Sequence, residues 1–223
     1  MPQQRSRKIL IYIFLFLIIG TLSNKNLNDG RFIEVNEIIV FGLDEENSRK
    51  IIDKLKLLQL GNLFFLDKNK IEEKIMSNSL VEKYSVFKKY PSSLKIKIDK
   101  TEFFAQVVKN DIYFFLGSNG KLIKTNKLDD NIPTIIGDFE NENFMKLKKA
   151  TDESNFDFFS IKKLFPHKSG RWDLELESGT FVKLPKDGIL ASLKFLILIL
   201  EENKEKKINK IDLRQKNQII LNG

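Results

Sequence analysis

The sequence predicts an α+β protein with three parts: an apolar N-terminal helix, a small sheet backed by two helices, and a larger, mostly antiparallel β region. An apolar run from Ile9 to Ile19 follows a basic start. Strand and helix patterns then alternate in the order β-α-α-β-β over residues 32–101. Residues 102–223 contain strand patterns separated by Gly and Pro turns, with one long helix in their second half. The 223 residues have room for one ordinary domain or two small ones.

The N-terminal segment has the features of an uncleaved membrane anchor. Three basic residues precede the apolar run, and no acidic residue occurs before Asp29. The run is short for a spanning helix, which usually needs about 20 residues, but it is saturated with Ile, Leu and Phe and lacks a following small-x-small cleavage site. Because basic flanks stay in the cytoplasm, we expect a cytoplasmic tail at 1–8, a transmembrane signal anchor at 9–23 and a linker at 24–31. A cleaved signal peptide is the alternative.

Residues 32–101 form the first predicted domain. Its first strand is the apolar stretch that ends at Gly42, and EENSRKIIDKLKLLQL then places apolar residues at helical spacing. Asp67 can cap a second helix. VEKYSVFKKYP predicts a strand, and SLKIKIDK predicts another, in which three apolar residues alternate strictly with charged ones. This order predicts a three-stranded sheet backed by two helices.

The second half contains a strand pair and an unusually apolar helix. RWDLELESGTFVKLP predicts two strands around the turn at Ser178-Gly179, with Trp172 in the core and the charged residues Asp173, Glu175 and Glu177 on the solvent side. The Phe-rich stretch NFDFFSIKKLF is also expected in the core, since aromatic side chains bury the largest area. The following helix is apolar nearly all round because of Phe195, Leu198 and Ile199. We expect it to be sandwiched between layers, with use by a partner as the alternative.

These elements and their residues resemble the FtsQ/DivIB family of bacterial cell division proteins, which begins with a POTRA domain. In the first domain the resemblance rests on Val40 and Gly42, Gly61-Asn62-Leu63-Phe64, Leu66-Asp67, Val81, Val86, Tyr90-Pro91 and Leu94-x-Ile96-x-Ile98. In the second it rests on Gly117–Ile123, Ile132–Gly137 and Ile211–Arg214. It implies a POTRA domain at 32–101 and an FtsQ-like β domain at 102–223. The family usually has Glu at Lys100 and Pro at Phe103, so the junction between the domains departs from its pattern.

The sequence offers little chemistry for catalysis. It contains no cysteine, Gly-rich phosphate loop, nucleophile elbow or metalloprotease helix. His167, the sole histidine, is interpreted as a solvated loop residue, and Glu175 with Glu177 as solvent-side charges rather than a glycosidase pair. We therefore nominate no catalytic, metal or cofactor-binding residue and no small-molecule substrate. The net charge of +8 is spread over the chain, without the aromatic and Arg stripe of a nucleic-acid groove.

The final segment, INKIDLRQKNQIILNG, is the candidate binding site. A turn near Lys216-Asn217 would make it a hairpin whose second strand runs from Gln218 to Leu221. That strand is either internal or an open edge that another chain joins by β-augmentation. The family resemblance implies that FtsB and FtsL dock here, on Arg214, Gln215, Asn217, Gln218, Ile219, Ile220 and Leu221.

The resemblance implies a non-enzymatic scaffold of the inner membrane at the division septum. Such a protein holds FtsB and FtsL, helps to assemble the divisome and helps to control septal peptidoglycan synthesis. Its POTRA domain meets other division proteins near the lipid surface. The alternative is a periplasmic POTRA-containing adaptor or chaperone for envelope proteins. A third class, a cell-wall hydrolase or other enzyme, has no residue set to support it.

Overall fold

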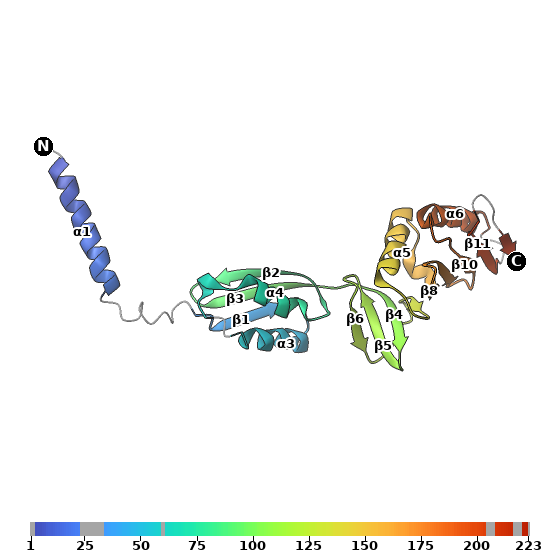
Figure 1. The fold of residues 1–223 in the computed structure, drawn as a ribbon, viewed down its shortest axis with the longest axis horizontal. Coiled ribbons are helices and arrows are strands. Elements are labelled where there is room, and N and C mark those ends of the chain that lie inside the picture. Colours follow the sequence, from blue (N-terminus) through green and yellow to red (C-terminus); the bar gives the residue numbers. More distant parts are fainter. Residues whose placement is uncertain (1–2, 23–33, 59–60, 204–207, 216–219, 223) are drawn as a thin grey trace. The chain divides into compact units, whose positions relative to one another are not determined.

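The computed structural model describes residues 3–22, 34–58, 61–203, 208–215 and 220–222. The chain divides into two compact units, Met1–Lys100 and Thr101–Gly223. Helix α1 (Gln3–Leu22) contains the apolar run and is drawn in blue in Figure 1. In the part of the chain that the structure describes, no helix combines the length and the apolar character needed to cross a membrane.

The first unit contains a three-stranded sheet with the strand order β1-β3-β2 (Figure 1). β1 (Glu37–Phe41) is parallel to β3 (Ser93–Lys100), and β2 (Val81–Lys89) is antiparallel to β3. Between β1 and β2 the chain forms α3 (Glu45–Lys56), the short 3-10 helix η2 (Leu63–Phe65) and α4 (Lys68–Met76). This is the predicted order β-α-α-β-β.

Helices α3 and α4 each begin at an aspartate that caps them. Asp44 accepts a hydrogen bond from the backbone N–H of Asn47 at 2.9 Å. Asp67 accepts bonds from the backbone N–H groups of Asn69 and Lys70 at 3.1 and 3.2 Å. Because the first N–H groups of a helix have no intrahelical partner, these carboxylates stabilise each helix start.

The helices cover one face of the three-stranded sheet. The core between them contains Ile51, Leu55, Leu63, Ile71, Ile75, Val81, Leu94, Ile96 and Ile98. The β3 residues that alternate with these, Lys95 and Lys97, are exposed. The strict alternation read from SLKIKIDK therefore corresponds to a sheet with one covered and one uncovered face.

The second unit contains a nine-stranded sheet with the order β12-β11-β10-β9-β8-β7-β4-β5-β6. Five of its pairings are antiparallel, and three, β10 with β11, β4 with β7 and β7 with β8, are parallel. The strands are β4 (Phe103–Lys109), β5 (Ile112–Gly117), β6 (Leu122–Thr125), β7 (Thr134–Ile135), β8 (Ile161–Pro166), β9 (Trp172–Leu176), β10 (Phe181–Lys183), β11 (Lys210–Asp212) and β12 (Ile220–Asn222).

Two long helices, not one, pack on this sheet. α6 (Ile189–Glu202) is the predicted helix, but α5 (Asn141–Ser154), followed by the 3-10 helix η3 (Phe158–Ser160), was not predicted. α5 and α6 lie side by side (Figure 1). Phe144 and Leu147 from α5 join Leu193 and Leu196 from α6 in one core. The α+β class is confirmed, with one more helix than expected.

The expectation that α6 is buried all round is wrong. Ile199 is buried, but the side chains of Phe195 and Leu198 are 43% and 54% exposed. A helix that packs on a sheet from one side needs only one apolar stripe in the core. In the described chain nothing covers the second stripe of α6.

Candidate functional site

The C-terminal strand β12 lies at one end of the nine-stranded sheet. It pairs antiparallel with β11, so that Ile211 is opposite Leu221 and Asp212 is opposite Ile220. Within the described residues its other flank has no strand beside it. The predicted antiparallel pair is therefore present, and β12 starts at Ile220. Among the described residues, only the flank of β12 that faces β11 is paired.

The predicted site residues are only partly described. Arg214 and Gln215 are exposed, and the side chain of Ile220 is 56% exposed. The backbone of Leu221 pairs with Ile211. Asn217, Gln218 and Ile219 lie outside the described residues.

Arg214 holds a buried carboxylate at the start of this hairpin. Its Nε donates to Oδ1 and Oδ2 of Asp212 at 2.8 and 3.0 Å, and its Nη2 donates to Oδ2 at 2.6 Å. The Asp212 side chain is 7% exposed, whereas that of Arg214 is 39% exposed. These hydrogen bonds from the guanidinium hold the pKa of Asp212 below its ordinary value, and they raise the pKa of Arg214.

Replacing Arg214 with alanine is expected to destabilise the second unit by about 1–3 kcal/mol at neutral pH, because the buried Asp212 carboxylate loses its guanidinium donors and keeps the backbone N–H of residue 214, at 3.1 Å. The folded-state pKa of Asp212 is lowered, so the stabilisation is complete above its ordinary pKa and is lost as the pH falls through the folded value. The loss should therefore shrink as the pH falls below the ordinary pKa of an aspartate and through the lower folded-state pKa of Asp212. Urea unfolding, followed by the fluorescence of the sole tryptophan, Trp172, measures it. Lys162→Ala, which removes an exposed cation from β8, is the control, and equal losses in the two variants at pH 7 would contradict the prediction.

A second buried carboxylate, Asp173, lies in the same row of the sheet. The register places Asp173 opposite Lys183, Lys183 beside Asp212, and Asp212 opposite Ile220. Asp173 was expected on the solvent side, but it is only 4% exposed. One row across four strands thus carries charges of alternating sign and ends at the exposed Ile220.

His167 is not a freely solvated loop residue as predicted. Its Nε2 lies 2.9 Å from Oδ2 of Asp173, and the Nε of Arg171 lies 3.4 Å from Oδ1 of the same carboxylate. Of these atoms, the Arg171 Nε and the Asp173 Oδ1 are buried and make no hydrogen bond. The contacts connect the 167–171 turn to the sheet. Sequence reasoning missed this cluster because the register that brings its charges together cannot be read from local patterns.

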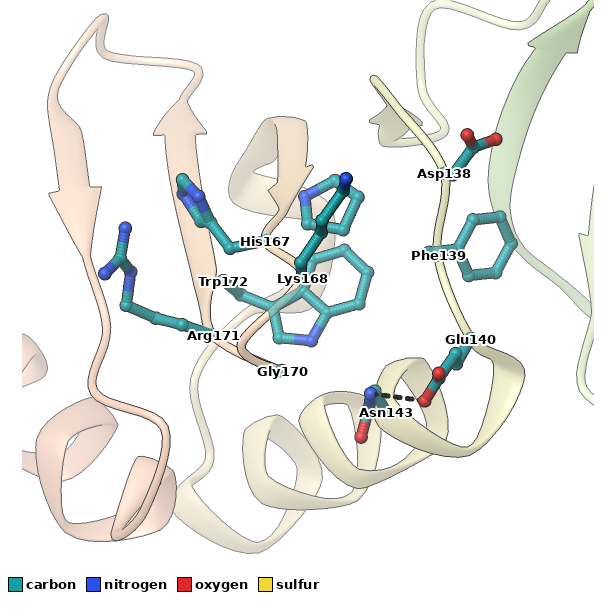
Figure 2. Close-up of a pocket in the computed structure, with 10 residues that line it drawn as sticks. Asp138, Phe139, Glu140, Asn143, His167, Lys168, Gly170, Arg171 and Trp172 are labelled. Atoms are coloured by element: carbon teal, nitrogen blue, oxygen red, sulfur yellow. Dashed lines mark hydrogen bonds between the residues drawn. The ribbon is translucent and has the colours of Figure 1, made fainter.

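Beside this cluster is a pocket with a volume of about 370 Å³ (Figure 2). Residues 138–143, which lead into α5, line one side, and residues 166–172 of the β8-β9 turn line the other. In Figure 2, Asp138, Phe139 and Glu140 lie on one side of the pocket and His167, Lys168 and Gly170 on the other, and the Phe139 ring points away from the turn. Glu140, at the α5 N-terminus, accepts a hydrogen bond from Nδ2 of Asn143 at 2.9 Å.

The pocket is lined by charged groups of both signs. For nucleophilic catalysis it would need a nucleophile, a base and a group that orients the base. His167 and Asp173 have the geometry of a base and the carboxylate that orients it. Among the described residues, however, no hydroxyl or thiol hydrogen-bonds the His167 side chain. We assign the pair to holding the turn.

Two family models match this chain. The model described as POTRA domain, FtsQ-type, matches residues 33–100, and the model described as cell division protein FtsQ/DivIB, C-terminal, matches residues 105–214. The chain belongs to the FtsQ/DivIB family. The match of the FtsQ/DivIB C-terminal model ends at Arg214, so the rest of the predicted site lies beyond it.

Curated members of the FtsQ/DivIB family are similar at moderate identity. Cell division protein DivIB of Bacillus subtilis is 30% identical over 145 residues, which cover 62% of this chain and 52% of that protein. Cell division protein FtsQ of Rickettsia bellii is 23% identical over 193 residues, covering 84% of this chain and 72% of that protein. The match thus spans about half of the Bacillus protein. A solved structure of the major extracytoplasmic domain of DivIB from Geobacillus stearothermophilus covers 47% of this chain and 98% of its own at 14% identity and a TM-score of 0.34, too low for comparing geometry.

Proposed function

We propose that this FtsQ/DivIB protein is a non-enzymatic scaffold that binds FtsB and FtsL by β-augmentation at β12. By holding them at the division septum, it helps to assemble the divisome and to control septal peptidoglycan synthesis. The observation that carries the proposal is the position of β12 at the end of the sheet order, with a strand on one flank only in the described residues. Such an edge presents backbone donors and acceptors that a partner strand can satisfy.

The charged row beside β12 supports an added strand of defined register. Asp212 and Ile220 share one face of the hairpin, and the Arg214 guanidinium holds the Asp212 carboxylate through hydrogen bonds. A partner strand on the free flank of β12 would place one side chain next to Ile220, at the end of the row. The proposed site comprises Arg214, Gln215, Ile220 and Leu221 with the intervening Asn217, Gln218 and Ile219.

We propose that α1 anchors the protein in the inner membrane, with residues 1–8 cytoplasmic, 9–23 in the bilayer and 24–31 as linker. Support comes from the apolar side chains of α1, nearly all of which are exposed, and from the basic residues before them. The POTRA domain at 32–101 would then lie near the bilayer, where it meets other division proteins, and the β domain at 102–223 follows it in the chain. Tethering raises the effective concentration of each partner, so modest interfaces suffice.

Replacing Ile220 with glutamate is expected to weaken binding of an FtsB–FtsL pair about tenfold or more, because the change puts a charge at the centre of an added-strand contact. Titration of the full chain in detergent with the purified pair measures the affinity. Leu198→Glu is the matched control, since Leu198 is 54% exposed and Ile220 is 56% exposed. It should leave the affinity within about twofold of the wild type.

Glutamate at position 220 also faces Asp212, so the protein's own hairpin must be checked. Hydrogen exchange over residues 208–222 shows whether β12 still pairs with β11. Ile220→Thr, which keeps a β-branched side chain and avoids the charge, is the second variant. If both variants keep the hairpin and bind as tightly as Leu198→Glu, the β12 site is refuted.

A further inference from the structure

The POTRA sheet has one face that the two helices leave uncovered. Its strands pair in register, with Ile39 beside Lys95 and Lys95 opposite Phe87, and the next row pairs Phe41 with Lys97 and Lys97 with Ser85. We call this surface the outer face; it consists of Glu37, Ile39, Phe41, Lys83, Ser85, Phe87, Lys89, Ser93, Lys95, Lys97 and Asp99. All of these side chains point away from the core, because along β1, β2 and β3 they alternate with the residues that pack against the two helices.

The outer face is both apolar and basic. The side chains of Phe41 and Phe87 are 36% and 52% exposed. The ammonium of Lys95 lies 4.9 Å from the centroid of the Phe41 ring, a cation–π distance. Aromatic rings beside long cationic side chains are typical of surfaces that lie in a bilayer interface, where the rings enter the headgroup region and the ammonium groups stay in water.

The net charge of the POTRA unit is concentrated on this face. The outer face has four lysines and two carboxylates, Glu37 and Asp99, whereas the rest of residues 34–100 has nine cationic and nine acidic residues. One carboxylate, Asp99, is 3.7 Å from Lys97, and the other, Glu37, accepts a hydrogen bond from Ser93 at 2.8 Å. The rest of residues 34–100 is therefore electrically balanced, and the net positive charge of this part of the chain lies on the outer face.

We infer that the outer face of the POTRA sheet docks on an anionic phospholipid surface. The inference rests on the proposed anchoring by α1: the eleven residues between α1 and Glu34 span at most about 40 Å, which keeps the sheet near the bilayer. Close to the membrane, several lysines act together on the negative surface potential, and salt screens this attraction beyond about 10 Å. A docked sheet would hold the POTRA unit in one orientation for its division partners.

The absence of cysteine from the sequence allows a single probe to be placed on each face. Ser85→Cys lies on the exposed outer face, and Asn69→Cys lies on the exposed surface of α4. Each full-length variant, carrying an environment-sensitive fluorophore, is inserted into nanodiscs of equimolar phosphatidylglycerol and phosphatidylcholine, or of phosphatidylcholine alone. Quenching by headgroup-labelled lipid reports whether the labelled face is on the bilayer.

We expect the Ser85 probe to be quenched at least about twofold more strongly in anionic nanodiscs than in neutral ones, with no such difference for the Asn69 probe. The double change Lys95→Glu and Lys97→Glu should abolish the difference. Its control, Lys56→Glu and Lys68→Glu, makes the same change in net charge at exposed positions of α3 and the start of α4, and should keep the difference.

The outcomes separate this inference from the anchor on which it rests. Failure of the chain to co-elute with nanodiscs refutes the anchor. A chain that co-elutes but whose Ser85 probe is unquenched, or equally quenched in neutral lipid, refutes the docking of the outer face on anionic lipid. Quenching that occurs only when other envelope proteins are added shows that the outer face does not dock on lipid by itself, and it also overturns the lipid inference.

Discussion

Replacing Trp172 with alanine is expected to destabilise the second unit by about 3–5 kcal/mol, the usual range for removing a large buried aromatic side chain. Trp172 is 1% exposed on β9, and its ring packs edge-to-face with Phe144 of α5 at a centroid distance of 6.2 Å. Phe144 in turn contacts Phe158 at 6.1 Å. Because Trp172 also borders the pocket at the 167–171 turn, truncation would extend that cavity into the core.

Hydrogen exchange measured peptide by peptide is the appropriate assay, since the variant loses the only tryptophan signal. Peptides from β8, β9 and α5 should lose protection, while those from the POTRA core, which is a separate cluster, should keep it. Trp172→Phe keeps an aromatic ring and should cost clearly less. Equal protection in Trp172→Ala and wild type would show that the second unit is not organised around this residue.

The POTRA unit was readable from the sequence because its sheet is covered on one side only. Leu94, Ile96 and Ile98 are buried, and Lys95 and Lys97 are exposed, so a period of two appears directly in the residues. α3 likewise shows its buried stripe through Ile51 and Leu55. Local pattern and tertiary environment agree in this unit.

The second unit departs from local pattern at three places. α5 was missed because its buried face includes Lys148, Thr151 and Ser154, which do not form an apolar stripe. Lys148 is accommodated there by Asp152 at 2.5 Å and by the ring of Phe104 at 4.5 Å. The Phe104 contact joins residues far apart in the chain, so it leaves no signal in the local sequence pattern.

The other two departures are the burial of Asp173 on β9 and the exposure of the second apolar stripe of α6. Alternation in β9 predicts that Asp173 is exposed, but His167, Arg171 and the neighbouring strands cover it. Conversely, the apolar residues around α6 predict burial on all sides, although Phe195 and Leu198 are exposed. Hydrophobicity alone does not say whether a second layer is present. For the candidate site, the sequence predicted a terminal hairpin, but only the strand pairing shows which flank of β12 is paired.

Replacing Gly42 with alanine is expected to destabilise the POTRA unit by about 2–4 kcal/mol, through a strained backbone and an overlap with β3. Gly42 follows β1 with φ +104°, a conformation that L side chains rarely adopt. A Cβ there would lie 1.9 Å from the carbonyl oxygen of Ile98 and 2.9 Å from its carbon, both backbone atoms that cannot rotate away. The end of β1 would have to move off β3, against which its residues pair up to Phe41.

The contributions of backbone strain and of steric overlap can be separated by comparison with a glycine that has a positive φ but no atom close to a built Cβ. Gly179, in the β9-β10 turn, has φ +83° and nothing within 4 Å of a built Cβ, so Gly179→Ala should cost only about 1 kcal/mol. Hydrogen exchange of β1 and β3 peptides for Gly42→Ala, and of β9 and β10 peptides for Gly179→Ala, compares the two losses. If alanine at 42 costs no more than alanine at 179, the close approach of β1 to Ile98 does not constrain this sheet, and the register that forms the outer face would lack its expected support.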